Sequence, residues 1–281
     1  AMVRSAIRTG NFFDVKIGDT ALHCLPTDFI AGKMMLVRAI ILGLSLEIVE
    51  PSANPMKDQY KNFDFVAMTP MQVHNSLDQL DQIKTLIIGG APIYPELNQK
   101  LVERHNRCFE TYGMTETVTH IAVSKLAVPK KPFKALDGIN LKVDKDGCLI
   151  VDAPDITDKL IYTNDMVEMH DEKNFTYLGR RDNVVNSGGV KIFPEVVERK
   201  LANYIDHPFF VFGLTDKILG EKLVLIVEGE LDDLAEIQKQ QLSCVSLEKF
   251  EAPKEIFFVS KIMTNNGKYL RKKTIKAFNI S

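Results

Sequence analysis

Residues 85–117 decide the fold class, and they read TLIIGGAPIYPELNQKLVERHNRCFETYGMTET. The β-branched run 85–88 stops at two glycines, which predicts a short buried strand ended by a turn. Pro95 then begins a helix, and the strand-like run 109–112 follows it before Gly113 turns the chain. Strands that alternate with helices favour a mostly parallel sheet covered by helices on both faces.

The same alternation extends upstream of this unit and gives way to another pattern downstream. Apolar runs predict strands at 21–25, 46–49 and 65–68, and helices at 30–44 and from Pro70 toward Leu80. After Pro129 the runs shorten and are joined by Gly, Asp and Asn turns, at 148–151, 160–163, 167–169 and 175–178. We therefore expect an α/β large domain whose mainly parallel sheet has a small antiparallel subdomain, a barrel or a sheet, packed beside it.

A third zone follows Asp182 and has helices and strands of its own. Helices are predicted at 194–205 and near 234–242, and strands at 209–213, 223–228 and 256–259. About 100 residues can form an independent core, so we predict a small α+β C-terminal domain. The predicted domains are 1–181 and 183–281, with a hinge at Asp182.

The composition is that of an ordinary globular protein, and it limits the partners. The 281 residues are 45% hydrophobic and 26% charged, with a formal net charge of −2. This balance gives no electrostatic argument for binding nucleic acid or an acidic membrane surface. The longest apolar stretch, 34–49, is interrupted by Arg38 and Glu47, so it predicts a buried helix and strand without membrane insertion.

The four cysteines lie far apart in the sequence and form no C-x-x-C pair; they are Cys24, Cys108, Cys148 and Cys244. Three of them stand in apolar, strand-like surroundings, which favours buried reduced thiols over disulfides or zinc ligands. No signal-peptide pattern opens the sequence. Together these observations predict a cytoplasmic protein.

Several widespread active-site signatures are absent from the sequence. It contains no G-x-G-x-x-G, no G-x-x-x-x-G-K-[ST], no G-x-S-x-G and no H-E-x-x-H. Their absence excludes the common dinucleotide-binding, P-loop, esterase and zinc-peptidase classes.

Polar sites follow two of the predicted strands instead. The turn Gly89-Gly90-Ala91-Pro92 can let a flat ring approach bare backbone, or it can simply end a strand. In the stretch 111–117, the Tyr112 ring can stack on a purine. Thr115 can donate to a phosphate oxygen and Glu116 can hold Mg²⁺ through oxygen. The alternative is a turn capped by its own Thr and Glu side chains.

Five motifs in one order resemble the adenylate-forming superfamily of acyl-CoA synthetases, peptide-synthetase adenylation domains and luciferases. They are TYGMTET at 111–117, TND at 163–165 where the family has T-G-D, GRRDN at 179–183, SGGVKI with PEVVE at 187–198, and NNGKYLR at 265–271. One such match would be weak, but five in the family's order are hard to obtain by chance.

The resemblance implies an acid–CoA ligase, an enzyme that uses ATP, Mg²⁺ and CoA. A carboxylate would attack the α-phosphate to give an acyl-adenylate and pyrophosphate, and the CoA thiol would then displace AMP. The implied catalytic residues are Lys268, Thr115 and Glu116, and Glu116 is also the metal ligand. The residues implied to bind nucleotide or CoA are Gly90, Ala91, Pro92, Thr111, Tyr112, Gly113, Met114, Asp165, Arg180, Gly188 and Gly189.

The two chemical steps imply that different residues face the reacting groups in turn at one site. By resemblance, Asp165 and Arg180 hold the ribose, and Lys268 neutralises charge in the first step. A rotation about Asp182 would then withdraw Lys268 and present the glycine pair at 188–189, which lines the pantetheine tunnel.

The stretch 9–55 resembles the o-succinylbenzoate–CoA ligases of menaquinone biosynthesis. It contains Phe12-Phe13, Gly18-Asp19, Leu25-Pro26 and the run IAGK at 30–33. The expected acid pocket comprises Phe29, Ala31, Gly32, Lys33 and Thr69. Lys33 could face the aryl carboxylate of the substrate or point to solvent.

The family's Ser/Thr/Gly/Lys-rich phosphate loop has no counterpart in the sequence. We expect it upstream of the first helix, so the chain would be a truncated large domain, poorly active by itself. Two alternatives stay open: another aryl- or acyl-CoA synthetase or carrier-loading adenylation domain, and a non-catalytic nucleotide- or CoA-binding module. The oligomeric state is also open, with a homodimer as one option.

Overall fold

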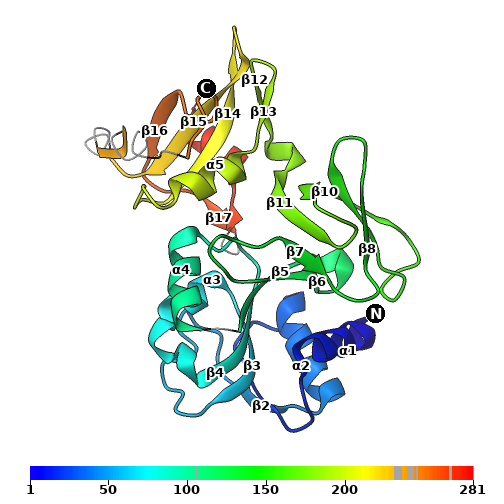
Figure 1. Ribbon diagram of the computed structural model, residues 1–281. Coiled ribbons are helices and arrows are strands. Elements are labelled where there is room, and N and C mark those ends of the chain that lie inside the picture. Colours follow the sequence, from blue (N-terminus) through cyan, green and yellow to red (C-terminus); the bar gives the residue numbers. More distant parts are fainter. Residues whose placement is uncertain (106, 231–235, 239–243, 245, 266–267, 281) are drawn as a thin grey trace. The chain divides into compact units, whose positions relative to one another are not determined.

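A computed structural model describes residues 1–105, 107–230, 236–238, 244, 246–265 and 268–280 (Figure 1). The chain forms two compact units, each described by itself below. The first contains residues 1–93, 97–163 and 168–177, and the second contains 94–96, 164–167 and 178–281. The domain bounds with a hinge at Asp182 stay a prediction.

The large sheet has eleven strands in the order β2-β1-β3-β4-β5-β6-β7-β11-β10-β9-β8. Its first five strands run parallel: β1 (Thr20–His23), β2 (Ser45–Ile48), β3 (Phe63–Met68), β4 (Ile83–Ile88) and β5 (Cys108–Gly113). Helices connect β1 to β2, β3 to β4 and β4 to β5, whereas β2 leads to β3 through turns (Figure 1). The parallel α/β core predicted from the alternating pattern is thus confirmed.

The antiparallel strands continue this sheet rather than forming a separate one, because β6 pairs antiparallel with β5. They are β6 (His120–Lys125), β7 (Phe133–Ala135), β8 (Asn140–Val143), β9 (Cys148–Asp152), β10 (Ile161–Met169) and β11 (Asn174–Arg180). The sequence pattern missed β6 to β8. It also split β10 in two, because the polar pair Asn164-Asp165 interrupts the apolar run inside one continuous strand.

Local hydrogen bonds and a glycine define the ends of two helices of the first unit. They are α1 (Met2–Phe13), α2 (Ile30–Leu42), α3 (Pro70–Asn75), the 3₁₀ turns η1 (Leu77–Gln82) and η2 (Thr115–Thr117), and α4 (Pro95–Arg104). In α3, Thr69 and Gln72 form a capping box, in which each side chain bonds the other residue's backbone N–H. Gly43 ends α2 with a φ of 68°.

A buried polar cluster joins α1, α2 and the start of β6. Thr9 Oγ1 lies 3.3 Å from His120 Nε2, and Arg38 Nη2 lies 3.5 Å from His120 Nδ1. Burial, and then the positive charges of Arg38 and Arg8, hold the pKa of His120 well below its usual value. The imidazole is therefore neutral in the folded protein.

The second unit contains a small mixed sheet with a helix against it. Its sheet has the order β13-β12-β15-β14, with β16 parallel to β15. Its elements are η3 (Arg181–Asn183), β12 (Val185–Ser187), β13 (Val190–Ile192), α5 (Pro194–Leu201), β14 (Phe209–Asp216), β15 (Gly220–Glu228), β16 (Glu255–Val259), the hairpin β17 (Thr264–Asn265) and β18 (Lys268–Tyr269), and α7 (Arg271–Ala277). A second small sheet with helices agrees with the predicted α+β character.

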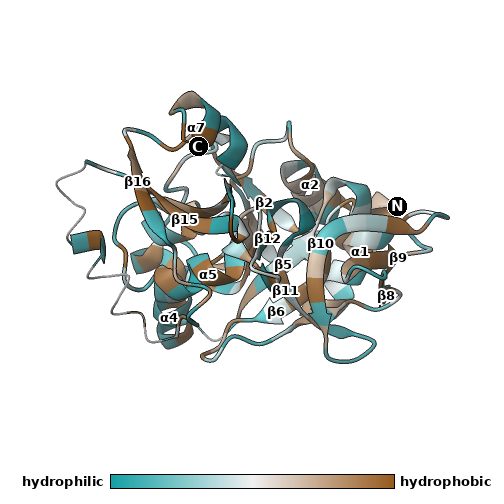
Figure 2. Ribbon diagram, turned by 90° about the horizontal axis from the view of Figure 1, so that it is seen from above, coloured by the Kyte–Doolittle hydropathy of each residue, from teal (hydrophilic) through white to brown (hydrophobic). Residues whose placement is uncertain are grey.

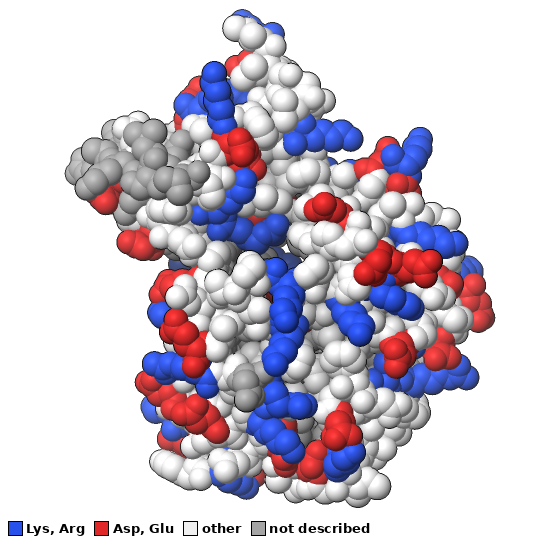
Figure 3. All heavy atoms as spheres, in the orientation of Figure 1, with Lys and Arg blue, Asp and Glu red and all other residues white. Residues whose placement is uncertain are grey.

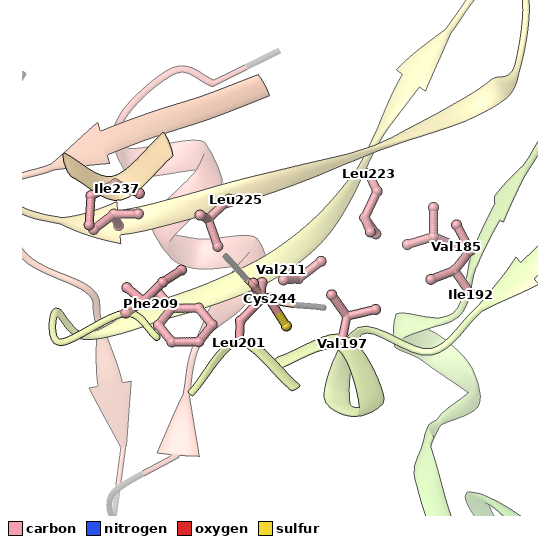
Figure 4. Packing of buried hydrophobic residues seen from close by; sticks show 12 residues of the cluster. Val185, Ile192, Val197, Leu201, Phe209, Val211, Leu223, Leu225, Ile237 and Cys244 are labelled. Atoms are coloured by element: carbon pink, nitrogen blue, oxygen red, sulfur yellow. The ribbon is translucent and has the colours of Figure 1, made fainter. Parts of the chain in front are cut away.

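Strand alternation gives this small sheet two buried faces. Phe209 and Val211 of β14 pack with Leu201 of α5 in the cluster of Figure 4. Phe210 and Leu214 belong to a different buried cluster, because successive side chains of a strand point to opposite faces. Figure 2 shows hydrophobic residues along β15 and β16. The predicted helix near 234–242 lies mostly outside the described residues.

Surface and composition features add three observations. All four cysteine side chains lie in the described part of the chain, are buried and form no disulfide. No helix in the described part of the chain combines the length and hydropathy needed to cross a membrane. On the face in Figure 3, acidic and basic side chains are interspersed.

The neutral, buried His120 predicts an acid-sensitive fold. The unfolded chain takes up a proton near pH 6.5 and the folded chain does not, so stability is full above that pH and falls below it. This group should lower the free energy of unfolding by about 1.4 kcal/mol for each pH unit below 6.5. Urea unfolding at pH 7.5, 6.5 and 5.5 measures the effect.

His120→Gln should lose much of this pH dependence, whereas His74→Gln, on an exposed residue, should keep it. Some dependence should remain in His120→Gln, because burial also lowers the pKa of His23. An unchanged slope in His120→Gln would contradict the neutral, buried imidazole.

Candidate active site

The carboxyl ends of four parallel strands meet at one edge of the large sheet. Gly89, just after β4, donates its N–H to the Met68 carbonyl at the end of β3, at 3.1 Å. Thr111 Oγ1 of β5 donates to the Ile88 carbonyl at 3.0 Å. Gln72 Nε2 donates to the Cys24 carbonyl beyond β1, also at 3.0 Å. This edge is where open α/β sheets bind ligands.

Gly89 and Gly90, the two glycines after β4, are required for different structural reasons. A Cβ on Gly89 would lie 2.5 Å from Thr111 Oγ1, so only glycine lets these strand ends approach. Gly90 has a φ of 89°, and a Cβ there would meet nothing within 4 Å. Ala91 is half-buried and Pro92 is exposed. The turn therefore presents open backbone beyond β4, as a flat ligand would require.

The stretch 111–117 forms the end of β5 and the turn η2. Thr117 Oγ1 accepts the Met114 N–H at 2.9 Å and donates to the Thr119 carbonyl at 2.8 Å. The turn therefore caps itself through Thr117, while the side chains of Thr115 and Glu116 are exposed. The predicted self-capping alternative holds for Thr117 and leaves the other two residues accessible to a ligand.

Close packing fixes this turn in place. A Cβ on Gly113 would lie 2.3 Å from the Thr119 carbonyl and 2.5 Å from His120 Cα. Val118 has a φ of 67°, which is unusual and strained for a β-branched residue. Backbone strain of this kind persists only where the surrounding structure over-determines it.

The Tyr112 ring lies in an aromatic cluster. Its centroid is 5.2 Å from that of Phe175, 5.9 Å from Phe133 and 6.2 Å from Tyr177. These rings fix the orientation of Tyr112 beside the turn, and they offer further aromatic surface near it.

The predicted acid-pocket residues fall into two groups. Phe29, Ala31 and Lys33, at the start of α2, are exposed. Gly32 is buried, and a Cβ there would lie 2.2 Å from the Pro26 carbonyl, so Gly32 lets α2 approach the loop before it. Thr69 is half-buried and its side chain is used in the cap of α3.

Arg38 was not predicted as a site residue, and it lies directly behind the turn. Its side chain is fully buried, and its Nη2 donates to Thr119 Oγ1 at 3.1 Å. Its Nε has no hydrogen-bond partner, and no carboxylate pairs with it among the described residues. Burial lowers the pKa of this guanidinium to about 10. The sequence signal is an arginine inside an apolar helix, which by itself indicates only that the apolar stretch 34–49 is interrupted by a charge.

The second unit holds the predicted ribose and hinge residues in one network. Asp165 and Arg180 are 3.6 Å apart, and Arg180 is also 3.8 Å from Asp182. Asn164, which replaces the family glycine, donates to Asp182 at 3.3 Å and accepts from Arg181 at 2.7 Å.

The remaining predicted residues of this unit lie in tight turns. Gly188 and Gly189 have φ angles of 59° and 84° in the turn between β12 and β13. Lys268 is exposed and pairs with Asn265 in the hairpin β17–β18. The first unit thus holds Gly90 and the 111–117 stretch, and the second holds the ribose, tunnel and lysine residues. Their joining into one site stays a prediction.

The described residues contain no group of three or more His, Cys, Asp or Glu side chains that could hold a metal. Mg²⁺ commonly uses one or two carboxylates and completes its shell with phosphate oxygens and water. An exposed Glu116 fits that mode of binding together with a nucleotide.

Comparison with known proteins agrees with this arrangement. The family model described as "AMP-binding enzyme" matches residues 1–155. An acyl-CoA synthetase (AMP-forming)/AMP-acid ligase II-like protein from Dyadobacter fermentans is 35% identical, with a TM-score of 0.61, covering 98% of this chain and 83% of that one. The 2-succinylbenzoate–CoA ligase of Bacillus cytotoxicus is 23% identical over 97% of this chain.

Solved structures of lower identity show the same fold. The o-succinylbenzoate CoA synthetase of Bacillus subtilis, in complex with its acyl-adenylate intermediate, is 21% identical with a TM-score of 0.82, over 97% of this chain and 64% of that one. The chain likewise spans 64% of the length of the curated Bacillus cytotoxicus relative.

Proposed function

The chain belongs to the AMP-binding enzyme family, and on that basis we propose that it forms an acyl-adenylate from a carboxylic acid and ATP and then a CoA thioester, releasing AMP. The observation that carries the proposal is the edge of the parallel sheet. There the open backbone at Gly90 lies next to a strained turn that exposes Thr115 and Glu116.

In the proposed first step, the substrate carboxylate attacks the α-phosphate of ATP and pyrophosphate leaves. The adenine would lie against the Gly90 turn and the Tyr112 ring. Asp165 and Arg180, already 3.6 Å apart, would bond the ribose hydroxyls. Thr115 would donate to phosphate, Glu116 would hold Mg²⁺, and Lys268 would neutralise the negative charge between the reactants.

In the proposed second step, the CoA thiolate attacks the acyl carbonyl and AMP leaves. The glycine pair at 188–189 would line the path of the pantetheine arm. Its positive φ angles keep this turn free of side chains. Lys268 and this turn both belong to the second unit, whereas Gly90 and the stretch 111–117 belong to the first, so the proposed rotation about Asp182 would exchange Lys268 for this turn.

For the substrate, we propose o-succinylbenzoate. Two of the relatives named above, from Bacillus cytotoxicus and Bacillus subtilis, are named as ligases of this acid, at 23% and 21% identity. This acid carries a second carboxylate, on its ring, and Arg38 supports binding of such a group. It is a buried cation without a carboxylate partner among the described residues, next to the turn that would hold the acyl-adenylate.

The direct test separates the two half-reactions. In the first mixture, the chain is incubated with synthetic o-succinylbenzoyl-adenylate and CoA, a reaction that does not require binding of the β- and γ-phosphates. In the second mixture, it is incubated with the acid, ATP, Mg²⁺ and CoA. We expect thioester and AMP from the first mixture. Binding of AMP or CoA with no product in either mixture would refute the ligase and support a non-catalytic binding module.

The Gly90 turn gives a second prediction with a matched control. Gly90→Ala and Gly18→Ala introduce the same backbone strain, since their φ angles are 89° and 86° and neither Cβ would meet a neighbour. Both should lower stability by about 1–2 kcal/mol. Only Gly90→Ala should weaken AMP binding in calorimetric titration. Equal AMP affinity in the two variants would remove the turn from the site.

Arg38 gives a third prediction, on substrate choice. Arg38→Met should weaken binding of o-succinylbenzoate by about 10- to 100-fold, the contribution of a charged hydrogen bond. The matched acid 3-benzoylpropionate lacks the ring carboxylate, so its affinity should change little. Calorimetric titration with each acid measures the difference. An equal loss for both acids would mean that Arg38 does not contact the ring carboxylate.

A further inference from the structure

A buried ion pair stands beside the lysine hairpin of the second unit. Glu198 of α5 is fully buried, and Arg271, the first residue of α7, bonds it through two nitrogens. The Nη2 to Oε2 distance is 2.9 Å. Burial by itself would lower the pKa of Arg271, but the bonds to Glu198 outweigh it and the pKa is raised. The guanidinium is therefore charged in place.

The pair binds both backbone polar groups of one residue, Val211, in β14, a strand at the end of the sheet order. Val211 donates its N–H to Glu198 at 2.7 Å and accepts from Arg271 Nη1 at 2.9 Å. The guanidinium also lies over the Phe210 ring, 5.5 Å from its centroid. Arg271 is thus fixed on three sides, by a carboxylate, a carbonyl and an aromatic face.

Only two residues separate Arg271 from Lys268 in the sequence. The Tyr269 ring lies 6.0 Å from the Phe210 ring, and Leu270 donates its N–H to the Met263 carbonyl at 2.8 Å. Three residues span at most about 11 Å of chain. The exposed Lys268 therefore depends for its position on a short backbone segment tied to β14.

We propose that the Glu198–Arg271 pair positions Lys268, so that its loss costs the adenylation step and spares thioester formation. The inference rests on the proposed function. Replacing both partners of a buried ion pair by apolar residues is often neutral for stability, whereas removing one partner alone is destabilising. The best-attested use of such a pair is to fix register. Misplacing a reacting group by about 1 Å can cost a factor of about 100 in rate.

The test compares the half-reactions in four variants. Lys268→Ala sets the expected pattern, in which adenylation is lost and conversion of preformed acyl-adenylate to thioester is kept. Arg271→Gln should lower adenylation about 100-fold and thioester formation less than about 3-fold. Arg271→Lys, which keeps the charge without the fork, should recover part of the rate. Lys222→Met removes another ion pair of this unit, to Glu255 at 2.6 Å, and should change neither step.

An equal fall of both half-reactions in Arg271→Gln would overturn the inference and indicate a merely structural role. A second measurement does not depend on activity. Amide hydrogen exchange at Tyr269 and Leu270 should quicken at least about tenfold in Arg271→Gln, while β14 and β15 keep their protection. Unchanged exchange at these two amides would also overturn it. If the wild-type chain forms thioester but too little adenylate to compare, the exchange result alone decides whether the ion pair holds the Lys268 segment. A wild-type chain inactive in both half-reactions would instead reject the proposed function, and the exchange result would still decide the role of the ion pair.

Discussion

The close approach of parallel strand ends is the constraint on which the candidate site depends. Gly89 has no room for a Cβ against Thr111, and Gly113 has none against the backbone at Thr119. These two contacts bring the ends of β4 and β5 together and tie them to the start of β6. The strained Val118 and the buried Arg38 follow from the same packing, because both lie where the turn meets β6 and α2. A ligand at this edge would meet the open backbone of Gly90, the exposed polar groups of the turn and the half-buried Tyr112 ring.

In the second unit, the main constraint is the attachment of the short Lys268 segment to the sheet. Its double-sided core holds β14 rigid, and the Glu198–Arg271 pair attaches the segment carrying Lys268 to that strand. In the proposed function, the first unit would offer a preformed surface for a nucleotide and an acid, and the second would offer groups on short turns and a hairpin. This division of residues between two units suits a two-step reaction, in which one set of side chains must leave the acyl-adenylate before another set approaches it.

Much of the fold was accessible from sequence because buried parallel strands contain short apolar runs, as at 65–68 in β3 and 86–88 in β4. The strands β6 to β8 were missed because their apolar runs are short or broken by polar residues, and pairing with other strands stabilises them. The site motifs located Gly90, Thr115 and Lys268 on the turns and hairpin described above. They could not show that Gly32 and Gly89 serve packing, that Thr117 caps its own turn, or that Arg38 is buried without a carboxylate. Those facts depend on which residues the fold brings together.

The central claim is that the carboxyl edge of the parallel strands binds an adenylate. Nuclear magnetic resonance of the ¹⁵N-labelled chain during titration with AMP tests it most directly, because each backbone amide reports its own surroundings. We predict saturable shifts at the turn 89–91 and along 111–117, with little change at the opposite ends of the same strands. Saturable shifts that leave both of these segments unmoved, or no shifts at millimolar AMP, would contradict the account.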